Sequence, residues 1–316
     1  MAQPIIDPVP VDMLLAELTD ERMLRTSNKG GNSIYVIDAH TCPNVMREIG
    51  RLREQAFRSA GGGTGKACDI DEFDTMQPPC RQLLVWDPLE KQILGGYRFI
   101  LGHDIVVQPD GTPRIATSHM FRFSDKFMKE YLPYTIELGR SFVRLDYQSS
   151  KYGAKALYTL DNLWDGLGAL TVDYPEIKYL FGKVTMYPTY DSECRDMLLH
   201  FMHKHFPDTD ALVQPITPLR TGTDLSHLDA IITGHDFKTD YKALNTFIRE
   251  HGINIPPLIN AYMSLSPSMR MCGTAINYEF GDVEETAILL TLSDIYEVKK
   301  NRHIDTYHPN HSNPPA

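Results

Sequence analysis

The sequence lacks several features that would point to common classes of protein. Basic residues are outnumbered, with 31 Lys and Arg against 41 Asp and Glu and a net charge of −10, which argues against a general nucleic-acid binder. The five cysteines are scattered without a C-x-x-C pair, so reduced thiols are expected rather than a disulfide framework. The longest aliphatic runs, such as AILL at 287–290, fall far below the roughly 20 residues of a membrane span. The opening residues, MAQPIIDPVP, do not resemble a signal peptide, and we expect a cytoplasmic protein.

Length and apolar content predict a substantial hydrophobic core. The 316 residues, 42% of them hydrophobic, suffice for one large domain or two ordinary ones. Residues 1–32 are predicted to form an N-terminal arm with a short helix around Met13–Leu24, and residues 33–316 a single α/β domain. Within that domain, 206–255 is predicted to be an inserted loop and helix region.

Hydrophobic periodicity predicts the order of the main elements. β-branched and aromatic runs indicate strands at 33–39, 81–87, 93–101, 134–145 and 178–186, and 81–101 is predicted to be an antiparallel hairpin. Apolar residues at helical spacing indicate helices near 45–56, 154–169, 191–206, 238–251 and from Pro257 onward. Two further apolar segments lie at 269–278 and 286–293. The fold class expected is α/β, with a mixed and largely antiparallel sheet flanked by helices.

The stretch SAGGGTGKACDIDEFD at 59–74 looks at first like a phosphate-binding loop. The pattern G-x-x-x-x-G-K-[ST] aligns only on Gly65 and Lys66, which puts Ala60 at its first glycine and Ala67 at its Ser/Thr. The hydroxyl that would ligate magnesium is therefore missing. The stretch also follows an amphipathic helix rather than a buried strand, and the carboxylates downstream would repel a triphosphate. We conclude that it is not a phosphate cradle.

Two groups of polar residues raise the question of a metal. Asp69, Asp71 and Asp74 are carboxylates at short spacing, which suits hard cations, but they lack the spacing of a calcium loop. His200 and His203 lie three apart on a predicted helix without a matching carboxylate pair, so a surface helix is favoured. A solvated acidic turn remains the simplest interpretation of the first group, and no metal site is predicted.

Four short segments occur in an order that points to a known family. These are LREQAF at 52–57, DIDEFD at 69–74, GGYRFI at 95–100 and ELGRSFV at 137–143. Together they resemble the acyl-carrier-protein-dependent N-acyltransferases that make ornithine and glycine lipids, a hemolysin-like branch of the GNAT superfamily. The resemblance covers roughly 34–292 and is strongest to the Bacteroidetes members tied to glycine lipids. One departure is Leu265-Ser266-Pro267, where ornithine-lipid relatives tend to carry Leu-Gly-Ala.

The resemblance implies a GNAT fold in which two neighbouring strands separate to hold a pantetheine thioester. Those strands should be 135–144 and 179–186, with pantetheine pairing along the exposed edge. The loop 144–155 and the helix after it should receive the phosphate of the carrier through backbone N–H groups. The residues expected at this carrier site are Arg144, Gln148, Lys151, Gly153 and Lys155.

Glu137 is the candidate general base, acting directly or through an oriented water. A carboxylate shielded from water has a raised pKa, which suits it to accept a proton from an ammonium group. The alternative is a structural ion pair with Arg140 or Arg98. Because residues three apart on a strand point to opposite faces, Glu137 and Arg140 share the site only if the strand is bulged, which we predict at Gly139.

The acceptor side is predicted to be built from the first helix and the acidic turn. Arg53 and Phe57 lie one turn apart on that helix. Asp71 and Asp74 should grip Arg53, Arg98 or the ammonium of the substrate. The glycines before them are expected to form a flexible lid over the acyl chain.

The sequence therefore predicts an N-acyltransferase for membrane-lipid biosynthesis. It would move a long, 3-hydroxylated acyl group from acyl carrier protein, or from acyl-CoA, to the α-amine of a small amino acid, glycine first and ornithine second. No permanently bound cofactor, metal or nucleic acid is expected, and peripheral contact with the membrane is compatible with this role. Two alternatives are an acyl-homoserine-lactone signal synthase and a non-catalytic lipid- or carrier-binding relative.

Overall fold

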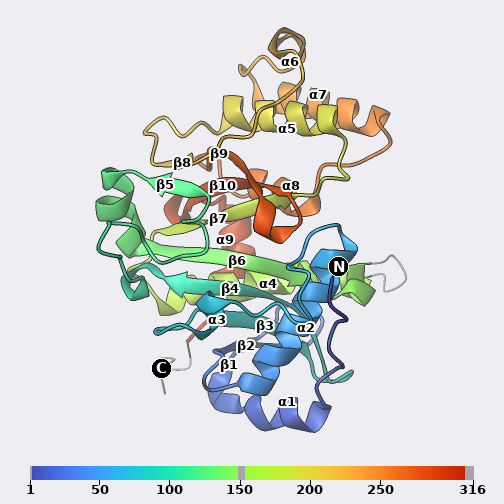
Figure 1. Ribbon diagram of the computed structural model, residues 1–316, viewed down its shortest axis with the longest axis vertical. Coiled ribbons are helices and arrows are strands. Elements are labelled where there is room, and N and C mark those ends of the chain that lie inside the picture. The colour runs from blue at the N-terminus through green and yellow to red at the C-terminus, as the bar shows by residue number, and fades with distance from the viewer. Residues whose placement is uncertain (1, 149–153, 310–316) are drawn as a thin grey trace.

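Alternation of apolar side chains along successive short segments builds a central sheet. In the computed structural model, which describes residues 2–148 and 154–309, these segments form an eight-stranded sheet in the order β1-β2-β3-β4-β6-β7-β10-β9 (Figure 1). The strands are β1 (Met23–Thr26), β2 (Ser33–Ile37), β3 (Arg81–Asp87), β4 (Gln92–Leu101), β6 (Thr135–Val143), β7 (Tyr179–Met186), β9 (Arg270–Asn277) and β10 (Val283–Thr291). Of the neighbouring pairs described, β6 and β7 run parallel and the others antiparallel. The predicted mixed, largely antiparallel sheet is confirmed.

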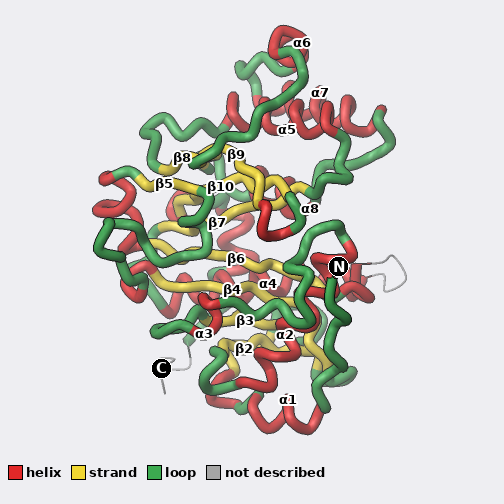
Figure 2. Tube along the Cα trace, in the orientation of Figure 1, coloured by secondary structure: helices red, strands yellow, loops and turns green. Residues whose placement is uncertain are grey.

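Helices lie on both faces of this sheet, and α6 and α7 lie beyond its β9 end (Figure 2). The helices of the described residues are α1 (Val11–Glu17), α2 (Pro43–Ser59), α3 (Glu72–Thr75), α4 (Ala154–Asp173), α5 (Ser192–His205), α6 (Leu225–Ile231), α7 (Phe237–Glu250), α8 (Pro257–Met263) and α9 (Glu297–His303). A small separate sheet pairs β5 (Phe121–Phe123) with β8 (Val213–Pro215). In the described part of the chain, no helix is long and apolar enough to cross a membrane.

The two faces of the sheet belong to different cores because successive side chains of a strand point to opposite sides. On one face, Leu84 and Trp86 of β3 are buried with Ile49 and Leu52 of α2. On the other face, β3 and β4 pack against α4, and the core on this face, which extends to α5, includes Leu83, Val85, Tyr97, Leu163, Leu167 and Met197. The side chains of a single strand therefore reach two separate environments.

The N-terminal region differs from the prediction. The helix expected at Met13–Leu24 ends at Glu17, and the chain then forms β1, which pairs antiparallel with β2. The end of the predicted arm is thus part of the main sheet, because pairing with β2 satisfies backbone groups that an isolated arm would leave to solvent. Residues 206–255 contain β8, α6 and α7, and apolar residues from α6 and α7, such as Leu228 and Leu244, are buried in the main core.

Candidate active site

The strands β6 and β7 separate in the middle of the sheet and open a cavity. Their pairing begins at Thr135 with Tyr179 and ends at Leu138 with Gly182, although both strands continue beyond that point. The cavity there has a volume of about 630 Å³. It is lined from both faces of β7, by Leu180 on one side and Lys183 on the other. The predicted separation is confirmed, and the cavity connects the two faces of the sheet.

Gly182 allows the strands to come close just before they part. A Cβ atom at this position would lie 2.6 Å from the carbonyl oxygen of Leu138, which is closer than real side chains come. Any other residue would push the two backbones apart at their last hydrogen-bonded pair. The point where the strands separate is therefore fixed by a glycine.

A bulge in β6 brings two predicted residues to the same cavity. Gly96 of β4 pairs with Phe142 and Arg98 pairs with Gly139, so a step of two residues on β4 (96 to 98) matches three on β6 (139 to 142). The residue with a left-handed backbone is Arg140, with φ of 49°, rather than Gly139. The predicted bulge is confirmed, but its strained residue is Arg140. As a result, both Glu137 and Arg140 line the cavity.

Three arginines and the acidic turn form one buried network, which we call the Arg–Asp cluster. It comprises Arg53, Arg98, Arg140, Asp69, Asp71 and Asp74. Local sequence places two of the carboxylates, since Asp71 caps α3 and the side chain of Asp74 accepts a hydrogen bond from the N–H of Asp71. The cluster holds equal numbers of positive and negative groups.

Arg53 and Asp74 are completely buried partners on the inner side of this cluster. Arg53 Nη1 lies 3.2 Å from Asp74 Oδ2, and its other nitrogen Nη2 donates to Gln82. The amide of Gln82 in turn donates to Asp74 Oδ1 at 3.0 Å. Neither Arg53 nor Asp74 lines the cavity, so the structure places both behind the wall rather than against a substrate.

Arg98 and Arg140 connect the cluster to the cavity. Arg98 Nη1 lies 2.6 Å from Asp71 Oδ1 and 3.5 Å from Asp74 Oδ2. Arg140 lies 3.0 Å from Asp69 and 3.4 Å from Asp71. Burial alone would raise the pKa of Asp71, but the guanidinium groups of Arg98, Arg140 and Arg53 together outweigh burial and hold that pKa well below its usual range.

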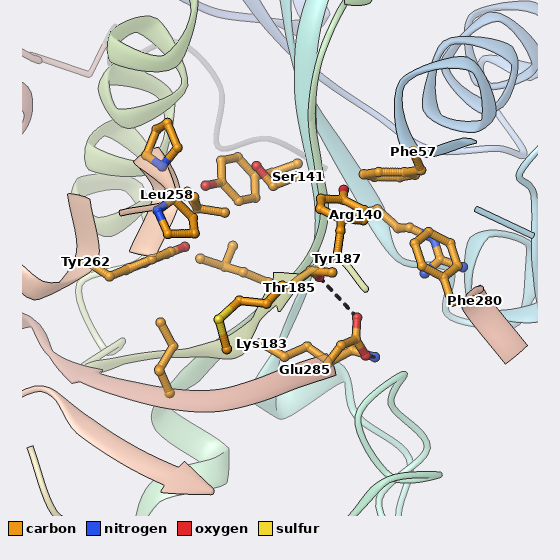
Figure 3. A pocket seen from close by; sticks show the side chains of 18 of the residues that line it. Phe57, Arg140, Ser141, Lys183, Thr185, Tyr187, Leu258, Tyr262, Phe280 and Glu285 are labelled. Atoms are coloured by element: carbon orange, nitrogen blue, oxygen red, sulfur yellow. Dashed lines mark hydrogen bonds and ion pairs between the residues drawn. The ribbon is translucent and has the colours of Figure 1, made fainter. Parts of the chain in front are cut away.

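Aromatic rings border the charged half of the cavity. The guanidinium carbon of Arg140 lies 4.3 Å from the centre of the Phe280 ring, a cation–π contact. Phe57 meets the same ring edge-on, with ring centres 5.2 Å apart. Figure 3 shows Phe57, Arg140 and Phe280 together at one end of the cavity. Phe57 thus lines the cavity as predicted, one turn from Arg53 on α2.

Glu137 has no ion-pair partner among the described residues. Its side chain lines the cavity and is 2% exposed. Burial raises the pKa of this carboxyl, while the nearby positive charges of Arg98 and Lys183 partly oppose the effect. The structural ion pair that we considered as an alternative is therefore not formed. A buried carboxyl with a raised pKa and open space before it is suited to accept a proton.

A second buried ion pair lines the cavity and was not predicted. Lys183 of β7 forms a close ion pair with Glu285 of β10, and their side chains are 8% and 4% exposed. Glu285 also accepts hydrogen bonds from Asn277 at 3.0 Å and Thr185 at 3.3 Å. The available signals in the sequence are a lysine inside the mostly apolar segment YLFGKVTM and a glutamate at the start of the apolar segment ETAILL.

The opposite half of the cavity is mainly apolar. Its walls combine strand residues with residues of α8 and the segment before it, and include Leu138, Leu180, Ile253, Leu258, Tyr262, Ile288 and Leu290. Tyr262 is held by an edge-on contact with Trp164 of α4, with ring centres 5.4 Å apart. In Figure 3, Tyr262 and Leu258 lie at the far end from Phe57 and Phe280. A long hydrocarbon chain fits this half by its chemistry.

The glycine-rich stretch binds a carboxylate of the protein itself. Glu54 accepts hydrogen bonds from the N–H groups of Thr64 and Gly65, at 3.0 and 2.8 Å. Backbone hydrogen bonds from Gln3 to Gly65 and from Ile6 to Ala67 fasten the stretch to the N-terminal segment. The amides that would cradle a phosphate are thus occupied, and the conclusion that this is not a phosphate loop is confirmed. The stretch is tied at several points, unlike the free lid that we expected.

The predicted carrier site lies partly outside the described residues. Arg144 Nε contacts Asp146 at 3.1 Å, and Gln148 Nε2 donates to the carbonyl of Val143 at 2.7 Å. Lys151 and Gly153 fall outside the described residues, and Lys155 lies in the first turn of α4 with its side chain also outside them. The phosphate-binding role of this loop stays a prediction.

Potential metal ligands converge at one place in the described part of the chain. Ligand atoms of Asp191, Cys194 and His251 lie within 4.8 Å of one another, and none of the three residues lines the cavity. Asp191, however, already accepts the N–H groups of Glu193 and Cys194 as the cap of α5. Burial raises the pKa of the Cys194 thiol to about 12, which disfavours the thiolate that a metal needs. The carboxylates of Asp69, Asp71 and Asp74 each pair with an arginine. They do not face one another across an open site, as the ligands of a metal ion would.

Sequence comparison assigns the class of protein that this fold and cavity define. Residues 52–157 match the family described as acetyltransferase (GNAT) domain, and this segment includes the second half of α2, the acidic turn, β3, β4 and β6. The chain is an acyltransferase of the GNAT superfamily.

Two relatives identify the particular family. The chain is 61% identical over 307 residues to a glycine N(alpha)-acyltransferase of Bacteroides thetaiotaomicron, covering 97% of this chain and 91% of the relative. It is 58% identical over 307 residues to a glycine N(alpha)-acyltransferase of Phocaeicola vulgatus, covering 97% and 94%. The chain belongs to the glycine N(alpha)-acyltransferase family.

Solved structures show more distant likenesses. The CoA-dependent acyl-homoserine lactone synthase BjaI with MTA aligns with a TM-score of 0.38 at 13% identity, over 87% of this chain and 89% of that one. FeeM, an N-acyl amino acid synthase from uncultured soil microbes, aligns with a TM-score of 0.38 at 10% identity, over 83% and 93%.

Proposed function

We propose that this enzyme transfers a long acyl group from a phosphopantetheine thioester to the α-amine of glycine. The observation that carries the proposal is the cavity at the separation of β6 and β7, which joins an apolar half to a charged half. An acyl chain suits the first and an amino acid the second, so the thioester would lie between them. Both relatives are named as glycine N(alpha)-acyltransferases, which supports glycine as the acceptor.

Glu137 would start the reaction by accepting a proton from the ammonium group of glycine. The freed amine attacks the thioester carbonyl carbon, a C–N bond forms, and the C–S bond breaks. The sulfur leaves with the electron pair and takes up the proton that nitrogen loses. Beyond Leu138 and Gly182 the strands β6 and β7 no longer pair with each other, which leaves edge groups for the amides of pantetheine.

The acyl donor is proposed to be acyl carrier protein, with acyl-CoA as the alternative that shares the same pantetheine arm. The chain and acyl carrier proteins are both acidic, so attraction would depend on a local basic surface such as Arg144 and the predicted loop after it. The end product would be an N-acyl amino acid for membrane lipids. Peripheral contact with a membrane would then serve product delivery.

The direct test supplies isotopically labelled glycine with a 3-hydroxyacyl thioester on carrier protein or on coenzyme A. We expect labelled N-acylglycine, detected by mass spectrometry, with the carrier-linked donor giving the higher kcat/KM. Parallel reactions with ornithine and S-adenosylmethionine measure acceptor choice. Absence of acylated glycine with both donors would refute the proposed function.

A buried phenol supports an acyl chain that carries a hydroxyl group. Tyr97 lines the apolar half, and its Oη is buried without a hydrogen bond of normal geometry among the described residues. Burial, together with the neighbouring Tyr97 phenol, raises the pKa of Tyr262 well above its ordinary value, so both phenols stay protonated. Ser141 and Tyr262 are near enough to interact with the Tyr97 phenol without meeting the geometry of a full hydrogen bond, so a hydroxyl on the chain would give it a better partner.

Tyr97→Phe should therefore lower kcat/KM for a 3-hydroxyacyl donor by about tenfold, because a hydrogen bond to the chain is lost. The measurement compares 3-hydroxyacyl and unsubstituted acyl donors of equal length. The unsubstituted donor serves as the control and should be affected less than about twofold. An equal loss with both donors would show that Tyr97 only packs against the chain.

A further inference from the structure

The pair of Lys183 and Glu285 has no part in the proton transfer described above. Both side chains are almost fully buried, and both line the charged half of the cavity. A buried ion pair is weak evidence for stability, because apolar residues of similar volume are often as stabilising. Its position in the wall of the cavity is better explained by a role in binding the substrate.

Lys183 retains hydrogen-bonding capacity toward the cavity. An ammonium group has three N–H donors. Among the described residues, Lys183 Nζ contacts Glu285 and, at 3.7 Å, the thioether sulfur of Met120, which is a weak acceptor. One donor is left for a ligand. Glu285 is itself held by Asn277 and Thr185, so the ammonium is held in one place. Figure 3 shows Lys183, Thr185 and Glu285 side by side.

The balance of charge around the cavity favours a ligand of both signs. The Arg–Asp cluster is neutral overall, and so is the Lys183–Glu285 pair. Among the described residues that line this half of the cavity, Glu137 is therefore an ionisable group without an ion-pair partner. An amino acid brings an ammonium group, which Glu137 accepts, and a carboxylate, which needs a cation within reach of Glu137. The charges of Arg98 and Lys183 are the ones that act on Glu137 most directly.

Lys183 is the better placed of the cations for that carboxylate. Arg98 is paired with Asp71 and Asp74, and Arg140 with Asp69 and Asp71. Each arginine therefore already faces two carboxylates, whereas Lys183 faces one. A further anion meets less repulsion at Lys183 than at either arginine.

We propose that Lys183, positioned by Glu285, binds the α-carboxylate of the amino-acid acceptor while Glu137 receives the proton of its ammonium group. The proposal rests on the proposed function, because it assumes an amino acid in the charged half of the cavity. It makes Lys183 the residue that distinguishes an amino acid from a simple amine. Glu285, Asn277 and Thr185 are positioning residues that act through Lys183.

The test replaces Lys183 with methionine, which keeps the length of the side chain and removes its charge. Steady-state kinetics are measured at saturating acyl donor with glycine and with glycinamide, which lacks the carboxylate, over a pH series because the two amines differ in pKa. A charge-assisted hydrogen bond supports an expected rise in KM for glycine of about 10–100-fold, with kcat affected much less. KM for glycinamide and for the acyl donor should stay within about twofold.

Two further variants separate binding from folding. Lys183→Met alone leaves Glu285 buried without its partner, so Lys183→Met with Glu285→Gln restores a neutral pair and should fold while keeping the high KM for glycine. Lys204→Met is the matched control, since Lys204 also pairs with a carboxylate, Asp229, but lies on α5. It should leave both values of KM unchanged.

Each outcome decides the matter. Wild-type enzyme that acylates glycine and glycinamide with equal kcat/KM would overturn the proposal without any variant, and so would Lys183→Met with an unchanged KM for glycine. Equal losses for both amines would also overturn it, because they would show a general effect on the site. Wild-type enzyme that acylates neither amine would instead refute the proposed function itself.

Discussion

Glu137→Gln is expected to lower kcat for glycine acylation by about 10²–10⁴-fold, the usual contribution of a general base. The glutamine keeps the shape of the side chain and cannot accept the proton. In the wild type, activity should rise with pH through the raised pKa of Glu137, because the ionised carboxylate is the active form. The variant should lose this acidic limb of the profile of kcat/KM against pH.

The stability of this variant provides its control. A carboxyl whose pKa is raised on folding favours the folded state fully at low pH, and this contribution is lost as pH rises through the folded pKa. At neutral pH, burial of this ionisable carboxyl without an ion-pair partner therefore lowers the stability of the wild type. A glutamine does not have this effect, so Glu137→Gln should melt at the same temperature or higher. A variant with wild-type activity and an unchanged acidic limb would show that the base lies elsewhere.

Asp74→Ala is expected to destabilise the protein by about 3–5 kcal/mol, the usual effect of breaking a buried ion pair from one side. The substitution leaves Arg53 and Arg98 buried with fewer partners, and it also removes the acceptor for Gln82 and for the N–H of Asp71. The free energy of unfolding is measured by chemical denaturation. Turnover should fall too, because Arg98 lines the cavity.

Glu72→Ala is the matched control for this experiment. Glu72 lies in the same short helix α3, but its side chain is 64% exposed and its partner Arg114 is at the surface. An exposed pair contributes about 0–1 kcal/mol, so this variant should be close to wild type. If Asp74→Ala were as stable as Glu72→Ala, the Arg–Asp cluster would not hold the site together as we infer.

Local patterns in the sequence predict much of the fold. The strands β3 and β4 are long, apolar and separated by a short turn, so their pairing follows from neighbouring residues alone. The helix α2 is equally clear from its spaced apolar residues. By contrast, β1 is a strand of four residues that is stabilised by its partner β2, and the sequence of the arm carries no such signal.

Only part of the site could be predicted from the sequence. Some of its residues lie in recognisable motifs, whereas others make contacts between strands that are far apart in the chain. Arg53, Arg98, Glu137 and Arg140 were identified through a resemblance, and the structure brings their side chains to one region. The pair of Lys183 and Glu285 joins strands far apart in the chain, so no local spacing relates the two residues. The left-handed backbone likewise falls on Arg140 and not on the adjacent glycine, because the register with β4 decides where the extra residue is placed.

The way in which β6 and β7 part has a consequence for how a substrate enters. Backbone hydrogen bonds between them close the gap at the end marked by Leu138 and Gly182, and the described strands do not pair with each other again beyond it. The opening between these two strands is thus a slot: hydrogen bonds between the strands close one end of it and leave the other end open. It is not a closed ring of backbone. A ring would force a long chain to be threaded in tip first and withdrawn the same way, because a bulky group at its other end could not pass through. A slot admits the chain sideways, with a bulky group at one end and a free tail at the other.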